Sequence, residues 1–238
     1  VKLTIIQSKY YKVGDLYVVN GEPLGLVYEI SDGGAHGKVV ALKAHRDLNL
    51  WYRTGLPYDE IHPEDPNNVG VIARSETDGQ ENMKAYKQIP DWKTHYPVAA
   101  YVSDLNDENG NPGWYLPAIK EVQAMVGWID GEVLSPDGEA GQEPSEAMKE
   151  KRKAINQLIV DNGGNEFYFY GYDVSFIIDQ TNAWEADYFN RIYTSTETDY
   201  QVHPMVFKFY LRNGWWETMH VYGDLAGSYG EVRPFLAF

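Results

Sequence analysis

Hydrophobic positions in the first 45 residues come in short runs that are separated by turn residues. The run at 16–19 leads into Asn20-Gly21, a dipeptide typical of tight hairpin turns. A second run covers residues 24–30, and after the turn at 31–34 a third covers residues 37–42. This pattern predicts three consecutive strands in a β-meander.

The middle of the chain changes to a helical rhythm. From Pro117, a residue favoured at the first helical position, apolar side chains recur at a spacing of 3.6 residues; they are Ile119, Val122, Met125, Val126 and Ile129. A second helix is predicted over 144–160, where Asn162-Gly163-Gly164 ends it. A shorter helix is predicted within 76–88, with Ser75 or Asp78 as its cap.

Strand patterns return after residue 166. An aromatic run at 167–170, a hairpin formed by 207–212 and 215–221 around Asn213-Gly214, and a last strand at 231–238 are predicted. Residues 53–75 read as a long surface loop, and the Gly-, Pro- and acid-rich stretch 131–143 as a mobile insertion. Strands, helices and strands in this order, without a βαβ alternation, predict an α+β fold with an antiparallel sheet, as one domain over 1–238.

Charge narrows the classes of partner. The net charge is −15 and the isoelectric point is near 4.7, so the surface repels nucleic acid and anionic membranes. No apolar run reaches the roughly 18 residues of a membrane helix, so no membrane insertion is expected. The sequence opens on Val1 rather than Met, and we expect that an export signal preceded it.

Five blocks of sequence resemble a bacterial family of C-type-lectin-like surface domains, which is related in fold to sulfatase-modifying factors. Gly113-Trp114-Tyr115-Leu116-Pro117 matches its "G-W-x-L-P" helix entry, and Tyr193-Thr194-Ser195-Thr196-Glu197 its "Y-W-S-S-T-E" strand. The other blocks are the first hairpin around 25–38, Asp78-Gly79 with Asn82, and the closing strand 232–238.

The resemblance implies a C-type-lectin-like α+β fold with antiparallel sheets, two or three helices and long loops, and a secreted or cell-surface location. Sulfatase-modifying chemistry depends on cysteine, and this chain has no cysteine, so that activity is not carried over. In the matched strand, Ser195, Thr196 and Glu197 are expected to hold neighbouring loops by hydrogen bonds.

The sequence contains little that indicates a catalytic or metal-binding site. The six histidines are scattered without ligand spacing, and there is no Gly-x-Ser-x-Gly elbow and no phosphate loop. With 35 acidic residues, some carboxylate pair falls close together by chance, so a glycosidase-like pair carries no weight. We expect no cofactor, with calcium as an alternative at the oxygen-rich stretch 104–110, which otherwise reads as an Asx-rich turn.

Aromatic residues supply the strongest candidate site, since the chain has 19 Tyr, 8 Phe and 7 Trp. Adjacent residues of a strand point to opposite faces, so one of Trp215 and Trp216 should face outward as a stacking platform. The candidate ligand-binding residues are Trp184, Tyr188, Tyr200, Arg212, Trp215, Trp216, Glu217 and His220.

The sequence therefore favours a non-catalytic, adhesin-like binding module outside the cell that recognises a glycan or a surface protein. Two alternatives stay open: an extracellular enzyme acting on glycans or peptides, and a structural subunit of a pilus or surface assembly. A deep cleft with paired carboxylates would favour the enzyme, and an unpaired terminal strand would favour the structural subunit.

Overall fold

The structure is a computed structural model of the 238-residue chain. It describes residues 10–45, 72–109, 113–130, 145–167, 191–197, 204–210, 215–220 and 231–238. For residues 107–109, 130, 191, 204–210 and 215–220 it describes the backbone alone.

A four-stranded antiparallel sheet contains both ends of the described chain. Its order is β1 (Leu16–Val19), β2 (Glu22–Ser31), β3 (His36–Ala41) and β7 (Phe235–Ala237), and a 3-10 turn (Asp32–Gly34) joins β2 to β3. Asn20 and Gly21 between β1 and β2 both have positive φ, 52° and 88°, as a tight hairpin turn requires. The predicted β-meander is therefore confirmed.

A second antiparallel sheet has the order β4 (Arg191–Glu197), β5 (Pro204–Tyr210) and β6 (Trp215–His220). The predicted hairpin is confirmed, since β5 and β6 pair from Met205 opposite His220 to Tyr210 opposite Trp215. The segment 231–237 links the two sheets, because Glu231 forms a bridge with Ile192 of β4 while β7 pairs with β3.

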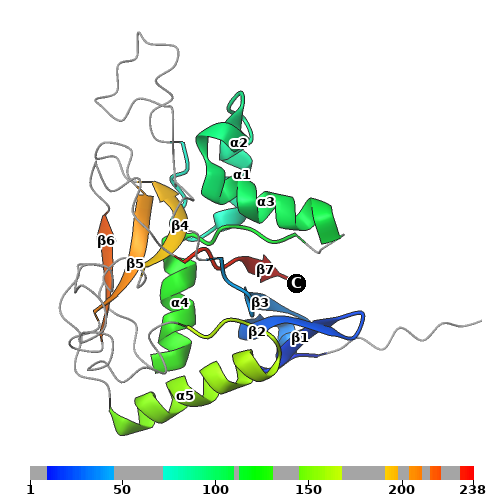
Figure 1. Cartoon of the computed structure of the whole chain (residues 1–238), viewed down its shortest axis with the longest axis vertical. Coiled ribbons are helices and arrows are strands. Elements are labelled where there is room, and N and C mark those ends of the chain that lie inside the picture. The colour runs from blue at the N-terminus through cyan, green and yellow to red at the C-terminus, as the bar shows by residue number, and fades with distance from the viewer. Residues whose placement is uncertain are drawn as a thin grey trace, which may run out of the picture.

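Five α-helices of the described part of the chain lie between the two sets of strands in the sequence. They are α1 (Gly79–Tyr86), α2 (Trp92–His95), α3 (Pro97–Asn109), α4 (Ile119–Asp130) and α5 (Glu146–Asp161). Figure 1 shows α4 standing between the two sheets, and it packs against β2 on one side and β4 and β5 on the other. Helix α5 packs against α4, α1 against β4, and α2 against α3.

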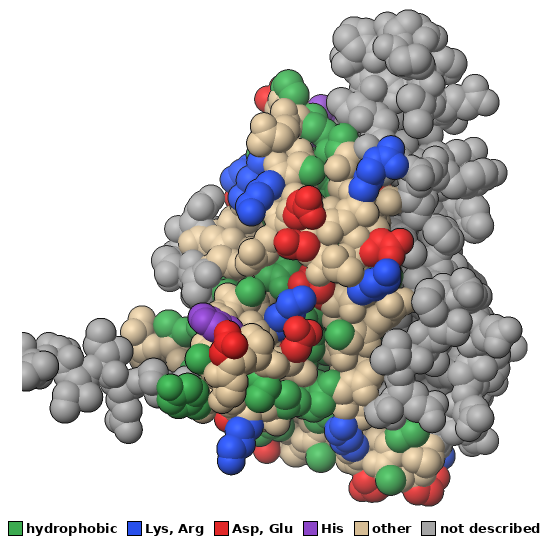
Figure 2. All heavy atoms as spheres, turned by 180° about the vertical axis from the view of Figure 1, so that it is seen from behind, with side chains coloured by type: hydrophobic (Ala, Val, Ile, Leu, Met, Phe, Trp, Pro, Cys, Tyr) green, Lys and Arg blue, Asp and Glu red, His purple; other side chains and the backbone are tan. Residues whose placement is uncertain are grey.

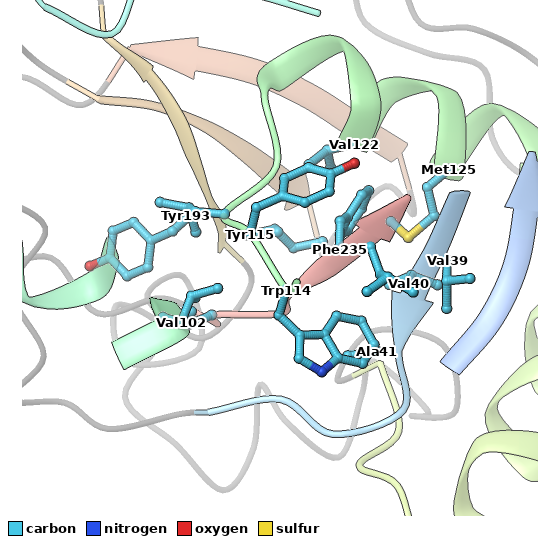
Figure 3. Packing of buried hydrophobic residues seen from close by; sticks show 14 of the residues in the cluster. Val39, Val40, Ala41, Val102, Trp114, Tyr115, Val122, Met125, Tyr193 and Phe235 are labelled. Atoms are coloured by element: carbon cyan, nitrogen blue, oxygen red, sulfur yellow. The ribbon is translucent and has the colours of Figure 1, made fainter. Parts of the chain in front are cut away.

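The core forms where α4 meets the two sheets. All five apolar residues of the predicted α4 stripe are buried: Ile119, Val122, Met125, Val126 and Ile129. Figure 3 shows Met125 and Val122 of α4 close to Phe235 of β7 and Val40 of β3, with Trp114 and Tyr115 beside them. Trp114 and Leu116 are both buried just before α4 and anchor the start of this helix.

Two predictions about the helices need correction. The expected two or three helices are five among the described residues, because α2 and α3 were not predicted. The helix predicted to begin at Pro117 is α4, which begins at Ile119. The unpredicted α3 opens at Pro97, where the missing N–H of proline costs nothing. The predictions for 53–71 and 131–143 lie outside the described residues, as does nearly all of the predicted strand 167–170.

The surface is mixed in character. On the rear face in Figure 2, acidic and basic side chains are interspersed over the middle, and hydrophobic side chains gather lower down. Where the structure describes side chains, the most exposed large hydrophobic residue is Tyr10, which is 63% exposed.

Candidate functional site

The structure places the predicted aromatic site in two parts. Trp184, Tyr188, Tyr200 and Arg212 lie outside the described residues. The other four, Trp215, Trp216, Glu217 and His220, lie on β6, at the edge of the three-stranded sheet.

The register of β6 assigns its residues to the two faces of this sheet. Trp216 is opposite Phe209 and lies on the face that carries Ile192, whereas Trp215 and Glu217 lie on the face that carries Tyr193. Ile192 and Tyr193 are both buried, so both faces are covered at β4, two strands away from the edge. The outward-facing tryptophan remains a prediction.

Glu121 is a buried carboxylate that binds four groups. Its Oε2 accepts the backbone N–H of Gly79 at 3.0 Å and of Ala118 at 2.9 Å. Its Oε1 accepts the Tyr115 hydroxyl at 2.8 Å and lies 3.0 Å from Nζ of Lys38. Because Ala118 precedes α4 and Glu121 sits in its first turn, this is the carboxylate half of a capping box. The side chain therefore fixes the starts of two helices at once.

The closeness of these two helix starts explains a glycine. A Cβ on Gly79 would lie 2.3 Å from the backbone oxygen of Leu116, so no side chain fits there. The N-cap of α1 is Asp78, which accepts the N–H of Glu81 at 3.0 Å and confirms one of the two predicted caps.

The strand block 195–197 holds loops, as predicted. Oε2 of Glu197 accepts the N–H of Ile72 and Ala73, at 2.9 and 3.2 Å. The Thr196 hydroxyl donates to Ser75 O and accepts the N–H of Ile119. The Ser195 hydroxyl accepts from the Asn82 amide at 3.0 Å. These buried groups attach the segment before α1 and the start of α4 to β4.

Arg233 and Glu231 form a second buried ionic group that the sequence did not single out. Both side chains are fully buried, and Nε of Arg233 donates to the Glu231 carboxylate. The guanidinium also donates to four backbone oxygens, those of Ala41, Leu42, Asn165 and Glu166. It lies 4.2 Å from the ring centroid of Phe167, in cation–π range. Arg233 thus joins the end of β3 to the segment after α5.

Two buried tyrosines, Tyr115 and Tyr28, interact electrostatically with the Glu121 carboxylate. Burial raises the pKa of Tyr115 far above its ordinary value, and the neighbouring Glu121 carboxylate adds to the shift. Burial likewise raises the pKa of Tyr28, with Tyr115 and Glu121 contributing. Both hydroxyls therefore stay neutral through the physiological range, and Tyr115 serves as a hydrogen-bond donor.

The described part of the stretch 104–110 is not the expected turn. Residues 104–109 form the end of α3, so the prediction of an Asx-rich turn is wrong there, whereas calcium binding stays a prediction. Their polar groups have other roles: Asp104 pairs with Lys93, and the Asn106 amide bonds both the N–H and the O of Trp114. Among the described residues, no three His, Asp or Glu side chains are grouped so that they could hold a metal.

Lysines and a tryptophan meet at the connection between α1 and α2. The ring of Trp92 is half-buried, and Nζ of Lys87 and of Lys93 lie 5.7 and 6.0 Å from its centroid. The side chains of Lys84, Lys87 and Lys93 are exposed. We call Lys84, Lys87, Trp92 and Lys93 the α1–α2 corner. The sequence signal for it was a local excess of lysine in an acidic chain.

Comparison with known proteins gives one informative result. No family model and no curated protein matches the sequence. A solved structure, a fimbrial protein from Bacteroides ovatus, is similar in fold with a TM-score of 0.51 and 16% sequence identity. The similarity covers 96% of this chain and 49% of that chain, so this chain spans about half the length of the fimbrial protein.

None of the helices in the described ranges is long and apolar enough to cross a membrane.

Proposed function

We propose that this chain is a non-catalytic domain of a fimbria-like assembly on the cell surface. The observation that carries the proposal is the similarity of 96% of the chain to part of a fimbrial protein. At this level of identity the similarity concerns the fold, and a fold hosts several functions. The proposal therefore needs support from the chain's own residues.

The buried polar groups provide this support. Glu121, Glu197 and Arg233 are buried, and the bonds described above join them to helix starts, loops and strands. A catalytic acid or base must instead reach a substrate proton from a cleft. These three groups stabilise a rigid scaffold, which suits a domain that presents surfaces to partners.

The experiment is to tag the full-length natural protein in its own host and to label intact cells with antibody for electron microscopy. We expect label on surface filaments, and removal of the tag when intact cells are treated with protease. Label confined to the cell interior would overturn the proposal.

A second function is binding through β6, and it would extend the first. We propose that a C-type-lectin-like arrangement presents β6 to a glycan or a surface protein. The register favours it, since Trp215 and Trp216 lie on opposite faces of an edge strand. A purified chain screened against neutral glycans, with calcium and with chelator, tests it. One of Trp215→Ala and Trp216→Ala should abolish binding without lowering stability; equal effects of the two would contradict this role.

A further inference from the structure

The three lysines at the α1–α2 corner differ from one another, because Lys93 pairs with Asp104 whereas Lys84 and Lys87 do not pair with a carboxylate among the described residues. Lys38, Lys120, Lys149 and Lys153 each pair with a carboxylate, at 2.7 to 3.0 Å. Lys84 and Lys87 have no ion pair among the described residues. Lys84 lies in the last turn of α1, and Lys87, three residues on, is its C-cap with helical backbone angles, so the two lie on the same side of the helix end. Their charges are therefore available to an outside partner.

An aromatic ring lies beside this charge. Lys87 and Lys93 approach the half-buried ring of Trp92. The face of an indole ring packs well against the C–H face of a sugar, and nearby polar groups add specificity. The exposed Asp91, and Asp104 beside its partner Lys93, can accept hydrogen bonds from sugar hydroxyls.

The positively charged region at the α1–α2 corner is small, and its small size favours a small anion over a long polyanion. Residues 84–95 contain three lysines and one aspartate, although the whole chain has 35 acids and 20 bases. At physiological ionic strength charges are screened beyond about 8 Å, so a small anion at the corner is affected mainly by Lys84 and Lys87, since Lys93 is paired with Asp104. A nucleic acid carries a charge about every 1.7 Å of duplex and would extend into the acidic surroundings. A single carboxylate on a sugar fits the corner better.

We propose that the α1–α2 corner binds an acidic sugar residue of a glycan. The pyranose ring stacks on Trp92, and Lys84 and Lys87 hold the sugar carboxylate. Binding requires Lys87 to swing from above the ring to the ligand, which a flexible lysine stem allows. The choice of a glycan among small anions rests on the proposed surface location, whereas the choice of an anion rests on the lysines alone.

The test is titration calorimetry of the purified chain with a galactose oligomer that ends in one galacturonate and with a neutral galactose oligomer of equal length. We expect binding of the acidic oligomer only, weakened by added salt. Lys84→Gln/Lys87→Gln and Trp92→Ala should each weaken binding about tenfold or more. The matched control is Lys149→Gln/Lys153→Gln on α5, which removes the same charge elsewhere and should change affinity less than about twofold.

Several outcomes would overturn the proposal. They are equal binding of the neutral oligomer, no binding of the acidic one, or equal losses in the control variant. Tighter binding of a single-stranded oligonucleotide or of a poly-glutamate peptide would overturn it in favour of those partners. If Trp92→Ala fails to fold, the lysine pair and Trp92→Leu decide. Surface labelling of cells is an independent readout, so failure of the glycan site is distinguishable from failure of the assembly role.

Discussion

Two regions of this protein use charged residues in opposite ways. At the junction of the two sheets, Arg233 and Glu231 are fully buried, and the guanidinium binds the carboxylate and four backbone oxygens. At the α1–α2 corner, Lys84 and Lys87 are exposed and form no ion pair among the described residues. In the first region the charged side chains join segments of the chain, and in the second region they lie at the surface.

This difference suggests that one region determines the stability of the fold and the other the binding of a ligand. Removing one partner of a buried ion pair leaves an uncompensated charge, which is costly, whereas an exposed lysine is solvated with or without a partner. Stability should therefore depend on the junction and binding on the corner. Substitutions at the two regions can test this division.

The largest effect is expected at Arg233. Arg233→Met leaves Glu231 buried without its cation and four backbone oxygens without their donor, and should lower the free energy of unfolding by about 3–5 kcal/mol. Urea unfolding followed by tryptophan fluorescence measures it. The control, Lys153→Met, removes a cation from an exposed pair with Glu150 and should leave the unfolding curve almost unchanged. Similar losses in both variants would contradict the division.

A smaller effect, which depends on pH, is expected at Tyr115. Its pKa is raised in the folded protein, so above pH 10 the unfolded chain loses this proton while the folded chain keeps it. Stability should therefore fall as pH rises above 10, by about 1.4 kcal/mol per pH unit for this group. Tyr115→Phe removes that contribution, so its stability curve should be flatter than that of the parent between pH 9 and 11.

The stability difference between the parent and Tyr115→Phe at pH 7 serves as the reference for the measurements at higher pH. At pH 7 the two proteins should differ by about 1 kcal/mol, because the variant loses the hydrogen bond from Tyr115 to Glu121. A difference that stays constant up to pH 11 would show that Tyr115 does not titrate differently in the folded state.

Much of the fold followed from the sequence because local signals agreed with the packing. The β1–β2 turn needed Asn20-Gly21, and the α4 stripe had the spacing of a buried helix. Residues of the family-like blocks also found physical roles: Asp78 caps α1, Gly79 allows close approach, and Asn82 binds β4 through Ser195. These blocks encode structure and say little about a ligand.

Other features could not be read from sequence. The acids and amides of 104–109 resembled a loop, but their partners Lys93 and Trp114 are set by tertiary packing. The pair of Arg233 with Glu231 is local, whereas its bonds to Ala41 and Asn165 join residues far apart in the chain. At the predicted aromatic site, β6 was correctly predicted as a strand, and its binding role stays a prediction.

The smallest effect on stability is expected at the corner, where the effect on binding should be large. Lys84→Gln/Lys87→Gln removes two exposed cations that hold no described carboxylate, so the free energy of unfolding should change by less than about 0.5 kcal/mol. The same variant should lose the affinity for the oligomer that ends in one galacturonate, as measured by calorimetry on one protein preparation. A variant that unfolds more easily by 2 kcal/mol or more would show that these lysines stabilise the fold as Arg233 does. Unchanged stability with lost binding would establish that the junction of the two sheets stabilises the fold and that the α1–α2 corner binds the ligand.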